Sequence, residues 1–208
     1  MPTSTWTFRR WRKVDPRDVI VLGVDPGTAA TGYGVVRGGE PGGPTLIECG
    51  VIRTSPRTTL SRRVTEIFEG IAEVIERHRP DALAVEGIFF AKNVRTTVVL
   101  GHARGVILLA GERAGIVVHE FAPKLIKKTV TGTGAATKQQ VQAMVARLLR
   151  LKQAPQPSDA ADGVACALTC IMGAGFSGRA AMIKRMPAGR QVAILRPNLS
   201  RLRAGTSR

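Results

Sequence analysis

An apolar segment near the start of the chain ends in a single acid, and this combination constrains the fold more than any other feature. Residues 19 to 24 (VIVLGV) are rich in β-branched side chains and have the length of a strand, which is typical of a strand buried on both faces of a sheet. Asp25 follows directly. An ionised carboxylate beside so much apolar surface costs free energy unless a cation, a proton or hydrogen bonds compensate it. Asp25 is therefore either the cap of the turn that Pro26 and Gly27 predict or a group that performs chemistry.

The segments that follow predict a mixed α/β sheet with helices packed against it. Their order is three strands, a helix, a strand, a helix, a strand and then helices. After the first strand, we expect strands at 32 to 36, 45 to 53, 82 to 87 and 115 to 120. We expect helices at 60 to 79, from about 94 to 114, and at 123 to 130, 138 to 150 and 159 to 172, with Ser158 as the N-cap of the last one.

Three further acids fall at the ends of these elements. Glu86 ends the strand that a parallel crossover places beside the first strand, so we expect it next to Asp25. Asp159 and Asp162 lie on one face of the last helix, in its first turn, where acids alternatively serve only to cap the helix dipole. Four carboxylates brought together need cations, and hard divalent ions suit oxygen ligands. Two such ions, about 4 Å apart, can activate water and stabilise the leaving oxygen in phosphodiester cleavage.

The net charge of +16 indicates a polyanionic partner, with nucleic acid ahead of an acidic membrane surface. Residues 1 to 18 hold five Lys or Arg and two acids, and residues 176 to 208 hold eight and no acid. We therefore expect a nuclease domain at 19 to 175 between a basic N-terminal arm and a basic C-terminal tail, both disordered. The aromatic residues of the arm would alternatively stack on bases.

No apolar run reaches membrane-spanning length, and the N-terminus has no apolar signal-peptide core, so we expect a cytoplasmic protein without a membrane partner. The three cysteines, Cys49, Cys166 and Cys170, are expected to be reduced, buried thiols. A metal site on Cys166 and Cys170 is the alternative, although no histidine or further cysteine lies near them in the sequence.

Four separated motifs resemble the RuvC family of Holliday-junction resolvases in the ribonuclease H-like superfamily. They are GVDPGTAATGYGVV, VEGIFFAKN, ARG at residues 103 to 105, and SDAADGVACAL, in that order and spacing. The resemblance covers roughly residues 19 to 175. It implies a mixed five-stranded sheet with helices on both faces, and a homodimer that nicks two opposed strands of a four-way DNA junction symmetrically during recombination and repair.

The resemblance also implies a cofactor, partners and roles for seven residues. The cofactor is Mg²⁺ or Mn²⁺, with two ions per site, and branch-migration proteins of the RuvA and RuvB type are the implied partners. The family's four acidic positions, which are catalytic and bind the metal, correspond to Asp25, Glu86, Asp159 and Asp162. Phe89 matches an aromatic residue that enters the junction centre, and Lys127 and Lys138 match basic residues near the scissile phosphate. The arm and the tail lie outside the resemblance.

Other functions fit the sequence less well. The turn after Asp25 also resembles the phosphate loop of actin-like ATPases and sugar kinases, but those need a second similar domain for which the chain has no room. A non-catalytic junction-binding protein would leave the four acids unexplained, because uncompensated carboxylates repel DNA. The nearest enzymatic alternative is a related nuclease that acts on another branched DNA.

Overall fold

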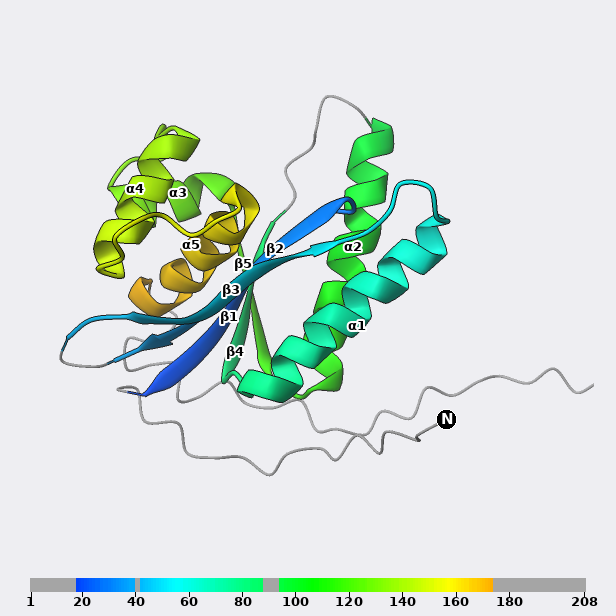
Figure 1. The fold of residues 1–208 in the computed structure, drawn as a ribbon, viewed down its shortest axis with the longest axis horizontal. Coiled ribbons are helices and arrows are strands. Elements are labelled where there is room, and N and C mark those ends of the chain that lie inside the picture. Colours follow the sequence, from blue (N-terminus) through cyan, green and yellow to red (C-terminus); the bar gives the residue numbers. More distant parts are fainter. Residues whose placement is uncertain (1–17, 40–41, 88–93, 174–208) are drawn as a thin grey trace, which may run out of the picture.

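The computed structural model describes residues 18–39, 42–87 and 94–173, which form a three-layered α/β domain (Figure 1). Its five-stranded sheet has the order β3-β2-β1-β4-β5. The strands are β1 (Val19–Asp25), β2 (Ala30–Gly38), β3 (Thr45–Arg53), β4 (Ala82–Glu86) and β5 (Val117–Phe121). The helices are α1 (Leu60–His78), α2 (Val94–Arg113), α3 (Pro123–Thr131), α4 (Lys138–Leu148) and α5 (Ser158–Met172).

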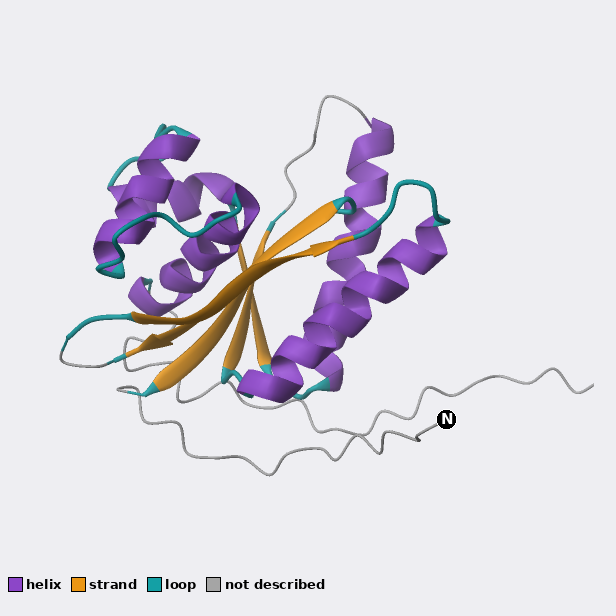
Figure 2. Ribbon diagram, viewed as in Figure 1, coloured by secondary structure: helices purple, strands orange, loops and turns teal. Residues whose placement is uncertain are grey.

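The sheet is mixed, as the order of elements predicts. β1 pairs antiparallel with β2 and β2 with β3, whereas β1 pairs parallel with β4 and β4 with β5. Helices α1 and α2 cover one face, and α3, α4 and α5 lie on the other (Figure 2). Because β1 and β4 are parallel neighbours, their carboxyl ends meet at one edge of the sheet.

Alternation along β1 divides the core into two clusters. Val19 and Val21 pack toward α5, and Leu22 and Val24 pack with α1 and α2 on the opposite face. All four are almost completely buried, which explains the continuous apolar run in the sequence. Asp25 continues the series of odd-numbered residues, so its side chain belongs to the α5 face.

Glycines let α5 lie directly on the central strands. A Cβ at Gly34 of β2 would be 2.7 Å from Cα of Val164, and a Cβ at Gly163 of α5 would be 2.6 Å from Cα of Tyr33. Gly23 of β1 is similarly close, since an added Cβ would lie 2.8 Å from Cβ of Ala167. We call Gly23, Gly32, Gly34 and Gly163 the glycine seam. No residue with a Cβ fits there unless the helix moves away from the sheet.

Several predicted boundaries are corrected by the structure. Ser158 is not the N-cap of the last helix but its first residue, because the carbonyl of Pro157 accepts the amide N–H of Ala160 and closes the turn one residue earlier. The fifth strand is shifted toward its carboxyl end and includes Phe121. Helix α1 ends at His78, since Arg79 adopts a left-handed conformation with φ of 49°.

The cysteines are free, as predicted, but Cys49 is only partly buried, whereas Cys166 and Cys170 are buried in the core under α5. Cys49 lies on β3 at the rim of the sheet, where less of the chain covers it. In the part of the chain that the structure describes, none of the helices could span a lipid bilayer. The predictions for residues 1–17 and for the tail from residue 174 lie outside the described residues.

Candidate active site

Two strand ends supply the first two acids of the site. Val24 of β1 pairs with Val85 of β4, so Asp25 and Glu86 are the next residues on neighbouring parallel strands. Glu86 follows Ala82 and Ala84 on the face that packs against α5, as Asp25 does on its own strand. Asp25 and Glu86 therefore lie next to each other, as predicted, and both side chains face α5.

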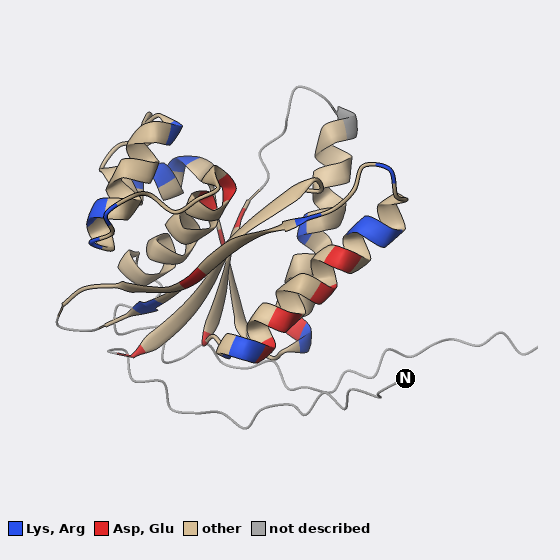
Figure 3. Ribbon diagram, in the orientation of Figure 1, with Lys and Arg blue, Asp and Glu red and all other residues tan. Residues whose placement is uncertain are grey.

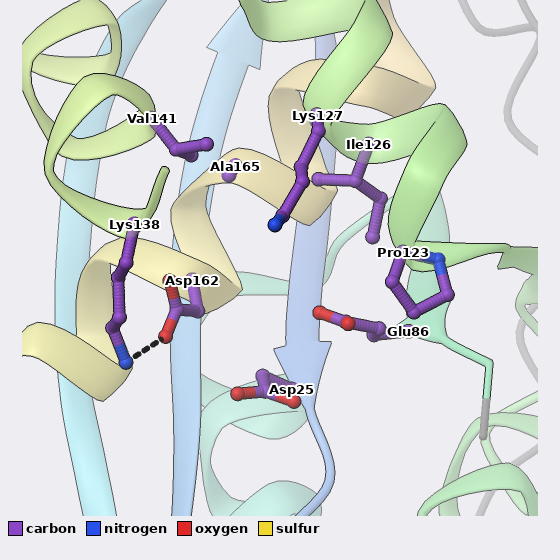
Figure 4. Close-up of a pocket in the computed structure, with 9 residues that line it drawn as sticks. All are labelled: Asp25, Glu86, Pro123, Ile126, Lys127, Lys138, Val141, Asp162 and Ala165. Atoms are coloured by element: carbon purple, nitrogen blue, oxygen red, sulfur yellow. Dashed lines mark ion pairs between the residues drawn. The ribbon is translucent and has the colours of Figure 1, made fainter. Parts of the chain in front are cut away.

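Helix α5 supplies the third acid from a distant part of the chain. Asp162 lies in the second turn, one residue before Gly163 of the glycine seam, and it is held over the end of β1 by that close contact. Asp25, Glu86 and Asp162 line one pocket with two lysines, Lys127 from α3 and Lys138 from α4 (Figure 4). The apolar wall of the pocket is formed by Pro123, Ile126, Val141 and Ala165.

Asp159 has a different position from the other three acids. It does not line the pocket, and its side chain is 36% exposed, compared with 19% for Asp162. It lies at the rim, where its Oδ1 is 3.7 Å from Nζ of Lys138. The structure thus brings three of the four predicted acids into one pocket and places the fourth beside it.

The acids raise one another's pKa. Burial, followed by the negative charges of Glu86 and Asp162, raises the pKa of Asp25 to about 8. Burial, and then the charge of Asp162, raises the pKa of Glu86 to about 7. Burial also raises the pKa of Asp162, although Lys138 opposes that change. Such mutual repulsion is typical of a site that is completed by added positive charge.

Lys138 supplies part of that positive charge. Its Nζ is 2.6 Å from Oδ2 of Asp162, and the hydrogen bond to this carboxylate raises the pKa of Lys138 (Figure 4). A capping box fixes the start of α4, because Gln140 N–H donates to Thr137 Oγ1 and Thr137 N–H donates to Gln140 Oε1. Lys138, the first residue of the helix, is thereby held at the pocket.

The donor set fits a hard divalent cation, since all the acidic ligands offer oxygen. Within residues 18–39, 42–87 and 94–173, no three carboxylate, imidazole or thiolate groups are gathered closely enough to hold an ion as they stand. A bound ion would draw the carboxylates of Asp25, Glu86 and Asp162 together and compete with Lys138 for Asp162. The described cysteines are not candidates, because Cys166 and Cys170 lie in the core and Cys49 is on another strand.

Phe89 and the glycine seam stand apart from the other residues of the site. Phe89 lies outside the described residues, so its predicted role at the junction centre is not addressed by the structure. The glycine seam was not anticipated, although it carries a signal in the sequence: Gly32 and Gly34 are two residues apart on one strand and therefore clear one face of the sheet.

The sequence is similar to proteins of one family. The family model described as "Crossover junction endodeoxyribonuclease RuvC" matches residues 21–170. A protein of that name from Desulforamulus reducens is 46% identical over 151 residues, which cover 72% of this chain and 91% of the relative. Another from Chlorobaculum parvum is 43% identical over 165 residues, which cover 79% of this chain and 88% of the relative.

Solved structures show the same fold. The structure of Thermus thermophilus RuvC in complex with a Holliday junction substrate matches with a TM-score of 0.70 and 38% identity, over 74% of this chain and 93% of that one. The yeast mitochondrial Holliday junction resolvase Ydc2 matches with a TM-score of 0.54 over 73% of this chain and 78% of that one. At 14% identity, this second match bears on the fold alone.

Proposed function

The chain belongs to the crossover junction endodeoxyribonuclease RuvC family, and on that premise we propose that it resolves Holliday junctions by metal-dependent cleavage of DNA. The observation that carries this proposal is the convergence of Asp25, Glu86 and Asp162, from three distant segments, on a pocket that also holds two lysines. The two lysines can neutralise a DNA phosphate, and the three carboxylates can hold metal cations. The pocket therefore suits metal-dependent cleavage of a phosphodiester.

The acids would hold divalent cations, Mg²⁺ or Mn²⁺, and two ions per site is the number we propose. Asp25, Glu86 and Asp162 are the proposed ligands and catalytic groups, and Asp159 at the rim joins them when Lys138 moves away. When bound, such ions activate a water molecule and stabilise the leaving oxygen of a phosphodiester. The buried carboxylates of Asp25 and Glu86 give up their protons to become ligands, since their pKa values are raised.

The lysines would bind the scissile phosphate. Lys127 and Lys138 enter the pocket from α3 and α4; Figure 4 shows Lys127 above the acids and Lys138 beside Asp162. An ammonium group has three donors and turns easily, so Lys138 can exchange the carboxylate of Asp162 for a phosphate oxygen. We propose that this exchange accompanies binding of the DNA and the metal.

Symmetric nicking of two opposed strands requires two copies of the site, and we propose a homodimer through α2. One face of α2 presents large apolar side chains to solvent, with Val98 54% and Leu109 50% exposed. Between them, Gly101 and Gly105 leave open space on the same side of the helix. Such an uncovered apolar face fits a second copy of the same helix packed closely against it.

Further proposals rest on the family alone. Phe89 would enter the junction centre and stack on a base, so Phe89→Ala should cleave an intact junction slowly and recover on a junction with unpaired bases at the crossover. If no recovery occurs, that role is wrong.

Branch-migration proteins of the RuvA and RuvB type are the proposed partners, to be tested by co-sedimentation with the junction. The cytoplasm, where such DNA intermediates arise, is the proposed location, to be tested by cell fractionation.

The experiment is cleavage of a labelled four-way junction, with and without Mg²⁺, by the wild type and Asp25→Asn. Losing one ligand charge should abolish cleavage while junction binding remains. Asp18→Asn is the control, since it removes an exposed carboxylate that pairs with Arg37 at the other end of β1. Flaps and forks tested in parallel would reveal a different branched substrate.

The stability of Asp25→Asn separates a chemical defect from a folding defect. Because the carboxylate is ionised at high pH against burial and repulsion, its replacement should raise the melting temperature of the metal-free protein at pH 9. Cleavage by Asp25→Asn at the wild-type rate, in a protein that is folded, would show that the proposed site is wrong.

A further inference from the structure

The segment between β3 and the start of α1 carries positive charge that the catalytic pocket does not use. Residues 53 to 63 contain four arginines and no acid. Residues 64 to 78, the remainder of α1, contain four glutamates and one arginine. The charge therefore changes sign along one continuous helix, basic at its start and acidic along its length (Figure 3). We call Arg53, Arg57, Arg62 and Arg63 the β3–α1 arginine cluster.

Most of this charge is not neutralised by the residues that the structure describes. Arg53 and Arg57 are exposed, and neither forms an ion pair with any residue that the structure describes. Nε of Arg62 is 3.1 Å from Oε1 of Glu66, but the side chain of Arg62 remains 64% exposed. Because Arg62 lies in the first turn of α1, it also adds to the positive end of the helix dipole instead of opposing it. The cluster is thus an anion-attracting surface to which the described residues supply little counter-charge.

Hydrogen bonds attach the cluster to the turn that follows Asp25. The backbone N–H of Thr54 donates to the carbonyl of Ala29 at 3.1 Å, and the Thr54 hydroxyl donates to the carbonyl of Thr28. Arg63 Nε in turn donates to Thr54 Oγ1 at 2.9 Å. The segment between β3 and α1 therefore lies at the carboxyl end of β1, the edge of the sheet at which Asp25 ends its strand (Figure 1).

The two basic surfaces lie on either side of that edge. Lys127 and Lys138 come from α3 and α4, which cover one face of the sheet, and the arginine cluster joins α1, which covers the other. A DNA backbone that passes over Asp25 would leave the lysines and meet the arginines next. The acidic length of α1 would repel a duplex laid along it, so only the tip of the helix is suited to contact.

We propose that the β3–α1 arginine cluster binds backbone phosphates of the duplex arm whose strand is held in the catalytic pocket. This inference rests on the proposed function, because it takes junction DNA as the ligand of the pocket. The planar guanidinium group of arginine matches two phosphate oxygens at once, which suits a positioning contact without sequence preference. Arg53 and Arg57, which are exposed and have no ion pair in the described chain, are the expected phosphate ligands.

The test compares Arg57→Gln with Arg79→Gln. Both substitutions remove one exposed positive charge, but Arg79 lies at the far end of α1, about 28 Å from its start. Affinity for a labelled four-way junction is measured by fluorescence anisotropy over a series of salt concentrations, in EDTA so that no strand is cut. Each lost phosphate contact should reduce the slope of log affinity against log salt by about 0.9.

We expect a reduced slope for Arg57→Gln, a further reduction for Arg53→Gln/Arg57→Gln, and the wild-type slope for Arg79→Gln. Equal slopes for Arg57→Gln and Arg79→Gln would overturn the proposal. Unchanged melting temperatures verify that Arg57→Gln is folded, since its side chain makes no described contact that holds the turn. Failure of the wild type to bind or cut junctions would instead overturn the proposed function, so the two outcomes are distinguishable.

Discussion

Asp25 is a buried carboxylate beside other acids, and this environment makes metal binding depend on pH. With pKa values of about 8 for Asp25 and about 7 for Glu86, these two carboxyl groups are largely protonated at pH 6 in the metal-free protein. A cation must displace those protons, so affinity for Mn²⁺ should rise between pH 6 and pH 8.5, by up to about tenfold per pH unit for each proton displaced.

Calorimetry in buffers of different protonation enthalpy checks this pH dependence by counting the protons released. The count should be highest near pH 6 and fall above pH 8. The same shifts act on folding: because the folded pKa values lie above the ordinary range near 4, the metal-free protein should lose stability as pH rises from about 4 to about 8. Manganese affinity that does not change over this range would contradict the raised pKa values.

Lys138 should compete with the metal, because its ammonium group occupies the carboxylate of Asp162 at 2.6 Å. Lys138→Met should therefore bind Mn²⁺ more tightly than the wild type in the absence of DNA, on the order of tenfold. Lys127→Met is the matched control: this lysine lines the same pocket, but no ion pair joins it to the acids in the described chain. An equal gain in both variants would mean that only the general charge of the pocket matters.

Among the elements, α5 positions Asp162 through the close contact of Gly163 with the backbone of Tyr33 on β2. Gly163→Ala would place a methyl group against the backbone of Tyr33, so α5 and Asp162 should shift away from the sheet. Overpacking of this kind costs about 1–3 kcal/mol, and the melting temperature should fall by about 2–4 °C for each kcal/mol. Thermal denaturation and junction cleavage measure the two effects.

The control for this change is Gly42→Ala, which adds the same methyl group where the nearest atom is Arg150 Nη1 at 3.7 Å. It should leave both stability and cleavage close to those of the wild type. If Gly163→Ala retains the wild-type stability and rate, then α5 does not need its close approach to the strands.

The elements were largely predictable because their signals are local. Alternation along the strands and apolar spacing in α1 depend on neighbouring residues, and the acids at strand ends follow from the parallel pairing of β1 and β4. The glycine seam was missed because it depends on pairs such as Gly34 and Val164, which are 130 residues apart and meet only in the folded chain. The ion pair between Lys138 and Asp162 was missed for the same reason, although both residues were predicted at the site.

For the whole molecule, the exposed face of α2 predicts the state of association. Leu109→Glu places a charge on the exposed apolar face of α2, so it should dissociate the proposed homodimer. Analytical ultracentrifugation would then report a monomer, and nicks in the two opposed strands would appear independently. Leu125→Glu, at a similarly exposed position on α3, is the control and should leave the mass unchanged.

The order in which the site is assembled has a consequence during synthesis. Asp25 and Glu86 leave the ribosome early, but Asp162 belongs to α5, the last element of the described chain. A growing chain can therefore form the hairpins and the parallel strands while it still lacks the helix that completes the metal pocket. An unfinished or prematurely terminated chain lacks the third acid of the proposed site, so we expect it to cut DNA only after the domain has been made in full.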